Sequence, residues 1–163
     1  MPVLFAMNNE YNVFGSDNIN ILINNNVWQV WNKYRQKTIF SREACVVLIG
    51  GVELKTKTII VEQCTEPMKN DRRYRNSFTL RDDGHQMAVD FAFQVTEGKQ
   101  FYLGTWHTHP EPNPFPSYLD EQDWRDCIYR NSDIPSFVFA IVGTKSVSLF
   151  PKGKIKNYEF QNT

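Results

Sequence analysis

The sequence predicts an α/β fold in which a mixed central β-sheet is flanked by about three helices. Segments rich in β-branched and aromatic residues alternate along the chain with segments of helical periodicity. One apolar run, residues 44–54, is nearly continuous, which is typical of a strand buried on both faces of a sheet. Because the chain has 163 residues, of which 41% are hydrophobic, we expect a single domain over residues 1–163.

The N-terminal part of the chain is expected to contain short strands followed by a helix. Residues 19–23 are the clearest early strand, and the asparagines at 24–26 can cap a helix that extends to about Gln36. The apolar residues of this helix recur at helical spacing: Val27, Val30, Trp31 and Tyr34. One stripe of the helix should therefore pack on the sheet.

Two buried strands are predicted next. The run at 44–54 is interrupted only by Gly50 and Gly51, which indicates a bulge or the close approach of another backbone at the end of the strand. Residues 58–64, TIIVEQC, form the second strand. If these two strands pair, they form the middle of the sheet.

Residues 66–83 show no sustained period and collect five basic side chains: Lys69, Arg72, Arg73, Arg75 and Arg81. The segment is expected to be a solvated loop, and the alternative is an insert that binds a partner. Helical periodicity returns at 83–97, with Asp82 or Asp83 as the cap and with His85 at the surface or the helix end. The expected core stripe of this helix is Met87, Ala88, Phe91 and Val95.

The C-terminal part is expected to supply three closing strands, at 137–142, 147–150 and 155–160. Turns are predicted between them at 143–145 and 151–153, where glycine, lysine and proline gather. No internal repeat or low-complexity segment interrupts this pattern.

The stretch from Gly104 to Asp123 carries the candidate chemistry. It begins in a predicted strand that ends at His107 and His109. Side chains two apart on a strand share a face and lie about 6.7 Å apart at the backbone, so the two imidazoles can close on one ion. Four alternating prolines stiffen the chain that follows, and Ser117 then opens a helix with Asp120 in its first turn. The apolar residues of that helix are Leu119, Trp124, Cys127 and Ile128.

His107, His109 and Asp120 form a candidate catalytic zinc site. Imidazole and carboxylate are usual zinc ligands, and three protein ligands with an open fourth position distinguish a catalytic site from a closed structural one. The alternative is that Ser117 and Asp120 form a helix capping box and that the paired histidines are ordinary structural residues. The joint pattern H-x-H-x7-S-x2-D arises by chance in roughly one of several thousand sequences of this length, which favours the metal site.

The motif H-T-H-P followed by S-Y-L-D resembles the signature of the JAMM metalloproteases, also called JAB or MPN+ domains. The upstream part of that signature is a glutamate ahead of a hydrophobic strand that ends in glycine, and Glu43 before residues 44–51 matches it. Bacterial members commonly have glycine after the cysteine, where this chain has Val46. The resemblance implies a cytidine-deaminase-like JAMM fold and one zinc ion, Zn²⁺, per chain on the three candidate ligands.

The resemblance also implies a mechanism and a substrate class. In the family, the glutamate at the position of Glu43 takes a proton from a zinc-activated water and passes it to the departing amine. Ser117 is expected to donate a hydrogen bond to the oxyanion that forms on the attacked carbonyl. Many JAMM enzymes hydrolyse the amide bond after the C-terminal tail of a ubiquitin-like protein, so we expect a deconjugating isopeptidase. The family's insertion at the place of residues 66–83 often helps to hold the substrate.

The chain resembles the small bacterial JAB proteins, some of which accompany ubiquitin-ligase-like enzymes in anti-phage (CBASS-type) operons. Two alternatives stay open. One is a JAMM peptidase that trims the tail of a sulfur-carrier protein or cuts a peptidoglycan peptide. The other is a non-catalytic MPN scaffold that only binds partners, which is disfavoured because scaffold members typically lack the metal ligands.

Charge and composition argue against other classes of protein. Eighteen basic side chains balance eighteen acidic ones, so no overall field favours nucleic acid or an anionic membrane. The sequence contains neither a signal-peptide pattern nor a long apolar run, so we expect a cytoplasmic protein, as a monomer or weak oligomer. Three cysteines without C-x-x-C spacing suggest neither a disulfide framework nor a cysteine zinc site.

Overall fold

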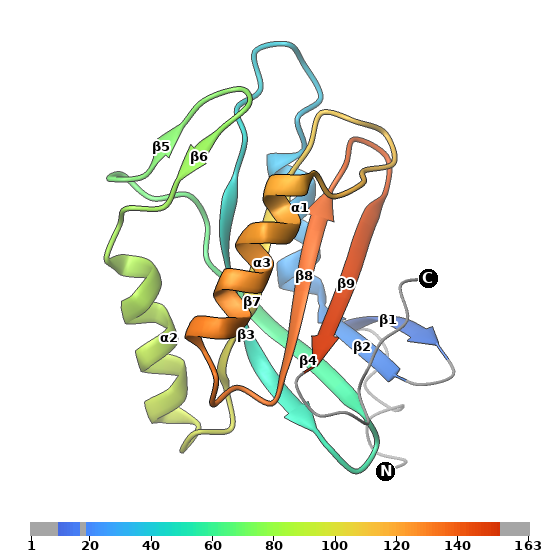
Figure 1. Ribbon diagram of the computed structural model, residues 1–163, viewed down its shortest axis with the longest axis vertical. Coiled ribbons are helices and arrows are strands. Elements are labelled where there is room, and N and C mark those ends of the chain that lie inside the picture. Colours follow the sequence, from blue (N-terminus) through green and yellow to red (C-terminus); the bar gives the residue numbers. More distant parts are fainter. Residues whose placement is uncertain (1–9, 17–18, 154–163) are drawn as a thin grey trace.

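A computed structural model describes residues 10–16 and 19–153 of the chain (Figure 1). Within these residues, seven strands form one sheet: β1 (Tyr11–Ser16), β2 (Ile19–Asn24), β3 (Cys45–Glu53), β4 (Thr58–Cys64), β7 (Phe101–Thr108), β8 (Ser136–Val142) and β9 (Val147–Gly153). Three helices accompany them: α1 (Asn25–Tyr34), α2 (Gly84–Val95) and α3 (Tyr118–Arg130). The predicted α/β architecture with a flanked central sheet is therefore confirmed.

The sheet is mixed, and its strand order is β1-β2-β4-β3-β7-β8-β9. The pairs β2–β4 and β7–β8 are parallel, whereas the other neighbours are antiparallel. β3 lies at the centre, between β4 and β7, as its continuous apolar sequence predicts. No helix in the described part of the chain is both long and apolar enough to cross a bilayer.

The helices cover both faces of the sheet. In Figure 1, α1 lies behind the sheet and α3 crosses in front of it. Alternate residues of β3 show the same division, because Val46 and Leu48 join the core that contains α1, whereas Val47 and Ile49 pack with Ala92 of α2. A strand buried on both faces needs apolar residues at consecutive positions, which explains the run in the sequence.

A bulge in β7 decides which way the first histidine faces. Gly104 has φ of +142°, and a Cβ at this position would lie 2.1 Å from the carbonyl oxygen of Val138. The β3–β7 register shifts here, so Leu103 and Trp106, three residues apart, both enter the core under α1. His107 consequently lies on the α3 face of the sheet.

The same kind of irregularity occurs at the predicted break in β3. The β3–β4 register shifts between Ile49 and Gly50, and a Cβ on Gly50 would lie 1.9 Å from the carbonyl oxygen of Ile60. The close backbone approach expected from the glycine pair is therefore confirmed.

The apolar stripe predicted for α2 is wrong at three of its four residues, whereas Ala88 packs against the core as expected. Its members Met87, Phe91 and Val95 are 69%, 67% and 61% exposed. The buried face instead carries His85 and Ala92, which are seven residues apart and therefore on one side of the helix. Small side chains and the hydrogen bonds of His85 let this face approach the sheet, so the larger residues point outward. In α3, Leu119 is likewise exposed, whereas Trp124 is buried as expected.

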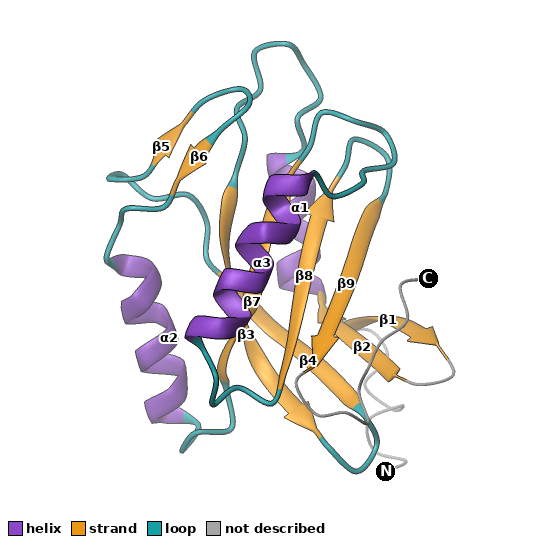
Figure 2. Cartoon of the chain, viewed as in Figure 1, coloured by secondary structure: helices purple, strands orange, loops and turns teal. Residues whose placement is uncertain are grey.

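Three further segments had a predicted structure: residues 66–83, 151–153 and 155–160. Residues 66–83 contain a small two-stranded hairpin, β5 (Arg72–Arg73) and β6 (Phe78–Thr79), and are not merely an irregular loop (Figure 2). The turn predicted at 151–153 is wrong, because these residues continue β9. The strand predicted at 155–160 lies outside the described residues.

Candidate metal centre

His107, His109 and Asp120 converge at the end of β7. His107 is held between two strands, since it pairs with Cys45 of β3 and with Ile141 of β8. The Nε2 atoms of the two histidines lie 3.1 Å apart. The carboxylate oxygens of Asp120 lie 3.3 Å from Nε2 of His107 and 3.4 Å from Nε2 of His109. The predicted set of ligands thus comes together in space.

The proline-rich bend between β7 and α3 is fixed by the turn after β8. The carbonyl oxygen of Glu111 accepts a hydrogen bond from Thr144 N at 2.8 Å, and that of Pro112 accepts one from Ser146 N at 3.0 Å. The hydroxyl of Ser146 also donates to the backbone and side chain in this bend. The bend therefore positions the start of α3, and Asp120 with it, against the end of β7.

Ser117 and Asp120 form the capping box that was the alternative interpretation of their spacing. Ser117 N donates to Asp120 Oδ2 at 2.7 Å, and Asp120 N donates to Ser117 Oγ at 3.1 Å. This cap does not remove Asp120 from the cluster, because Oδ1 still faces His107. The backbone N–H of Ser117 instead orients the carboxylate, as outer hydrogen bonds commonly do for metal ligands. The structural and the ligand roles of Asp120 are compatible.

The spacing of the three side chains fits a tetrahedral metal ion. Nitrogen and oxygen ligands about 2.0–2.1 Å from a tetrahedral zinc ion lie about 3.3 Å from one another. The Nε2–Nε2 distance of 3.1 Å and the 3.3 Å from Nε2 of His107 to Oδ1 of Asp120 agree with that value, whereas the 3.4 Å contact of His109 Nε2 is made to the other carboxylate oxygen, Oδ2. Two Nε2 atoms that face each other can share only one hydrogen bond, and then only if one ring is protonated there. Within the described residues, these three side chains are the one group found with metal-ligand spacing.

The charges in the cluster stabilise one another. Burial by itself would raise the pKa of Asp120, but hydrogen bonding to His107 and His109 holds the pKa of this carboxyl far below its usual range. The contact with Asp120 in turn raises the pKa of His109. Asp120 is therefore a carboxylate at neutral pH, the state required of a metal ligand.

Glu43 shares a cleft with the cluster. This cleft has a volume of about 1000 Å³, and its lining includes Glu43, His107 and Asp120. Glu43 is half-buried and lies two residues before Cys45, the partner of His107 in the sheet. Burial raises the pKa of its carboxyl, whereas the nearby histidines lower it. A carboxyl with a raised pKa beside a candidate metal site suits proton transfer.

Ser117 lies at the exposed start of α3, beside the same cluster. In the described part of the chain, its hydroxyl oxygen accepts a hydrogen bond from Asp120 N, and no acceptor is found for its proton. A hydroxyl carries one proton as well as two lone pairs, so Ser117 can cap the helix and still donate to a bound group.

Three residues whose hydrogen bonds surround Glu43 were not predicted as functional residues: Thr108, Gln36 and Arg73. Thr108, which is buried, accepts from Ala44 N at 3.0 Å and donates to Gln36 Oε1 at 2.8 Å. Gln36 donates in turn to the carbonyl of Arg75 at 2.9 Å and is only 3% exposed. Arg73 donates to the carbonyl of Glu43. A glutamine after a helix and an arginine in a basic run carry no local signal of such contacts.

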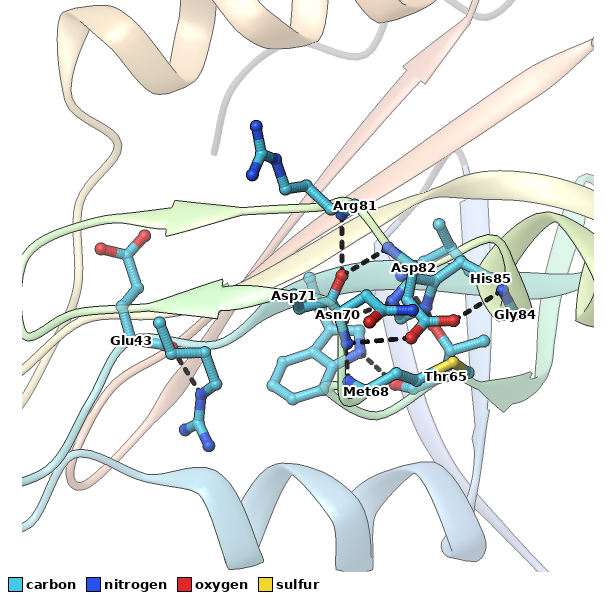
Figure 3. A network of polar contacts seen from close by, with 12 residues as sticks. Glu43, Thr65, Met68, Asn70, Asp71, Arg81, Asp82, Gly84 and His85 are labelled. Carbon is cyan, nitrogen blue, oxygen red and sulfur yellow. Dashed lines mark hydrogen bonds and ion pairs between the residues drawn. The ribbon is translucent and has the colours of Figure 1, made fainter.

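The third histidine lies outside the metal cluster and not at the surface. His85 is 2% exposed, and its Nδ1 and Nε2 atoms lie 2.7 Å from Thr65 Oγ1 and Asp71 Oδ2 respectively (Figure 3). The expected surface position of His85 is therefore wrong, although the residue does lie at the start of α2. Its two polar partners, from distant parts of the sequence, make its burial possible.

Comparison with known proteins identifies relatives of this chain. Residues 32–155 match the family model described as prokaryotic homologs of the JAB domain. A protein named CD-NTase/cGAS isopeptidase from Vibrio cholerae serotype O1 is 39% identical over 119 residues, which cover 73% of each chain. A protein of the same name from Escherichia coli strain TW11681 is 35% identical over 126 residues, or 77% of this chain and 76% of that one.

A solved structure supports the fold independently. The solution structure of protein DSY2949 from Desulfitobacterium hafniense matches with a TM-score of 0.52 at 16% sequence identity. The match covers 87% of this chain and 99% of the other. At this identity the likeness concerns the fold alone. The family match covers most of the chain, and the relatives match over most of their own length, so the resemblance seen in the sequence motifs is confirmed: this chain belongs to the family of prokaryotic homologs of the JAB domain.

Proposed function

We propose that this protein is a zinc-dependent isopeptidase that releases a conjugated protein by hydrolysing the amide bond after its C-terminal tail. The observation that carries the proposal is the approach of His107, His109 and Asp120 to tetrahedral spacing in the cleft that also contains Glu43. Membership of the JAB family and the shared name of the curated relatives support it.

The two imidazoles and the Asp120 carboxylate would hold the ion, with Ser117 N orienting the carboxylate. Zinc in such a set of three protein ligands supplies a Lewis acid that acidifies water and polarises a carbonyl group. His107 is fixed by β3 and β8, and Asp120 by its helix cap. These supports keep the ligand atoms in place without the ion, which reduces the reorganisation needed on binding.

Glu43 is the proposed general base. Glu43 lines the cleft together with two of the candidate ligands, and its carboxyl group would take a proton from the attacking water and deliver it to the departing amine. Burial raises the pKa of Glu43, which brings its proton affinity closer to that required at neutral pH. A glutamine at this position would keep the shape of the side chain and lose the proton transfer.

Ser117 is the proposed donor to the oxyanion. Its hydroxyl is adjacent in the capping box to the ligand Asp120, and its proton is available to a bound carbonyl. A donor of this kind that points at developing negative charge typically contributes about 2.7–4 kcal/mol to the lowering of the barrier. Ser117 would therefore have two tasks, one in the helix cap and one in the reaction.

The proposed substrate is a conjugate of a CD-NTase/cGAS-type enzyme, and the proposed setting is anti-phage defence. The name shared by the three curated relatives supports this choice over other ubiquitin-like conjugates. An extended tail suits the open cleft, whose lining includes Glu43, residues of α3 and Ile134. A purely scaffolding role is disfavoured, because the ligand atoms are present and correctly spaced.

The experiment uses the purified full chain and a CD-NTase-type enzyme from the same genome, joined through its C-terminus by an amide bond to a fluorescent protein. We expect about one zinc per chain, cleavage directly after the tail, and loss of turnover in Glu43→Gln with the zinc retained. A sulfur-carrier tail fusion and a peptidoglycan peptide serve as competing substrates. Cleavage of a competitor alone would replace the proposed substrate, and a metal-free, inactive chain would refute the proposed function.

A further inference from the structure

The backbone of Glu43 is held by the hairpin β5–β6. Glu43 N donates to the carbonyl oxygen of Tyr74 at 2.7 Å. The carbonyl oxygen of Glu43 accepts from Arg73 Nε at 3.0 Å, and the neighbouring carbonyl of Arg42 accepts from Arg73 Nη2 at 3.1 Å. Both polar backbone groups of the proposed base are thus paired with two consecutive residues of the hairpin.

Arg73 is itself held in one orientation. Its guanidinium carbon lies 5.1 Å from the centre of the Tyr34 ring, and that ring packs on Trp106 of β7 at 5.9 Å between centroids. A planar guanidinium that stacks on an aromatic ring and donates through two separate nitrogens has little freedom to move. Arg73 therefore connects the segment of Glu43 to the strand that carries His107.

The base of the hairpin is organised by one carboxylate. The side chain of Asp71 has no exposed surface and accepts three backbone hydrogen bonds, from Met68, Arg81 and Asp82, at 2.8–2.9 Å. Because these donors come from both ends of the segment that contains β5 and β6, Asp71 closes the segment on itself. Asp71 is two residues before Arg73, so the base of the hairpin and the contact with Glu43 are directly linked.

His85 attaches this base to the central strand. It contacts Asp71 at 2.7 Å and Thr65 at 2.7 Å, and Thr65 exchanges hydrogen bonds with the backbone of Val47 in β3. β3 begins two residues after Glu43. The contacts therefore form a closed circuit from Glu43 through Arg73, Asp71 and His85 back to β3. In Figure 3, Glu43 lies on one side of the view, the Asp71–His85 network lies on the other, and the pale green hairpin runs between them.

The Thr65–His85–Asp71 row also has the composition of a nucleophilic triad, but its surroundings exclude that role. Thr65 is 6% exposed, and its hydroxyl oxygen accepts a hydrogen bond from Val47 N. A nucleophile needs access for a substrate carbonyl and donors for the resulting oxyanion. The row is therefore a structural support and not a second active site.

We infer that the hairpin β5–β6 is a clamp that sets the position of Glu43, with Arg73 as the positioning residue and the buried Asp71–His85–Thr65 row as the anchor of the clamp. This inference rests on the proposed function for the role of Glu43 in turnover. Its structural part, the coupling of the Glu43 backbone to the hairpin, does not depend on turnover. The basic segment 66–83 then acts on the reaction itself, in addition to any contact with substrate.

The kinetic test compares Arg73→Ala, Arg73→Lys and Arg72→Ala in the full chain. Arg72 is the matched control, because it is the preceding residue of the same strand and its side chain is exposed. We expect Arg73→Ala to lower kcat about 10- to 100-fold, as misplacement of a catalytic group by about 1 Å does, with KM within about twofold of wild type and zinc content unchanged. Arg73→Lys keeps the positive charge and loses the planar guanidinium group that donates through two nitrogens, so it should recover part of kcat. A raised KM with wild-type kcat would overturn the inference, since it would mean that the hairpin only binds substrate.

Hydrogen–deuterium exchange provides a test that needs no activity. Arg73→Ala and, separately, Asp71→Asn should speed exchange in peptides that cover residues 40–46 and 70–80 together, and leave residues 105–109 and 136–142 protected. Arg72→Ala should leave all four peptides unchanged. If the wild type is inactive on the conjugate but residues 40–46 and 70–80 loosen together, the proposed function fails and the coupling stands. Unchanged exchange at 40–46 in both variants would overturn the clamp whatever the activity.

Discussion

This protein has two clusters of histidine and aspartate side chains, one formed by His107, His109 and Asp120 and the other by His85 and Asp71. The hydrogen bonding of the two clusters differs. At the end of β7, two imidazole Nε2 atoms face each other and one carboxylate, at 3.1–3.4 Å. Beside α2, the single imidazole of His85 has a different partner on each nitrogen, both at 2.7 Å. The carboxylate of this second cluster also accepts three backbone N–H groups.

The difference shows what distinguishes a candidate metal-binding cluster from a hydrogen-bond network that only stabilises the fold. In the His85 cluster, each donor has an acceptor, so the protein itself satisfies the buried polar groups and nothing needs to be added. In the His107 cluster, the Nε2 atoms of both histidines and the carboxylate of Asp120 lie within 3.4 Å of one another. Among the described residues, Nδ1 of His109 makes no hydrogen bond and lies 3.9 Å from Oε2 of Glu111. Two neutral imidazoles and a carboxylate that converge in this way can each direct a lone pair at one cation.

The largest expected effect separates the two clusters by their metal content. His107→Ala and Asp120→Asn should each abolish the proposed zinc binding and all measurable turnover, because the first removes a proposed ligand and the second removes the charge of another. His85→Gln should keep about one zinc per chain and instead lower the free energy of unfolding by about 1–3 kcal/mol, since it leaves buried partners unsatisfied. Metal analysis and denaturant unfolding of the three variants measure both effects. Zinc retained in Asp120→Asn, or lost from folded His85→Gln, would contradict the distinction.

The next effect concerns the base beside the first cluster. Glu43→Gln should lower kcat about 10²- to 10⁴-fold, the usual contribution of general acid–base catalysis, while zinc content and the thermal midpoint change little. Single-turnover kinetics with the fluorescent conjugate measure the loss in the chemical step. Glu53→Gln serves as a control, because Glu53 lies at the far end of β3 from this cleft. Wild-type turnover in Glu43→Gln would remove Glu43 from the mechanism.

Ser117 should show a smaller loss of activity together with a change in helix stability. Ser117→Ala removes the proposed oxyanion donor, which corresponds to a decrease in kcat of about 10²- to 10³-fold. It also removes the acceptor for Asp120 N, at a cost of about 1 kcal/mol in the free energy of unfolding. Ser117→Asp restores a cap without a donor, so it should recover stability and not activity. Recovery of both by aspartate would show that Ser117 acts only as a cap.

The smallest expected effect is an acid dependence of the second cluster. Burial by itself would raise the pKa of Asp71, but its hydrogen bonds from Arg81, Met68, Asp82 and His85 lower that pKa from 3.8 to about 2. A carboxyl with a depressed pKa stabilises the fold above pH 3.8, and this contribution is lost as the pH falls through about 2. The difference in unfolding free energy between wild type and Asp71→Asn should therefore shrink from pH 5 to pH 2. A difference that is constant with pH would contradict the assignment.

Hydrophobic periodicity correctly predicted the helices and strands in which the buried and exposed residues follow the period of the element. β4 occupies the expected residues 58–64, and α1 and β3 begin and end within two residues of their predicted bounds. The predicted α2 stripe was wrong at Met87, Phe91 and Val95, because hydrophobicity alone marked these residues as core. Which face of a short helix packs on the sheet depends on the residues that it meets there. In α2 the buried face is the one that carries His85, whose two hydrogen-bond partners are distant in the sequence.

The class of fold and the identity of the candidate ligands could be predicted from the amino-acid sequence, because a strand period of two and one capped helix turn place these residues through short-range geometry. The contacts of Glu43, the burial of His85 and the attachment of the basic hairpin to Glu43 became visible only in the folded chain. These depend on hydrogen bonds between residues far apart in the chain, such as Arg73 with Glu43 and His85 with Thr65. Sequence periodicity cannot predict such pairs, because each residue on its own is an ordinary polar residue. The two partners become neighbours only when the chain folds.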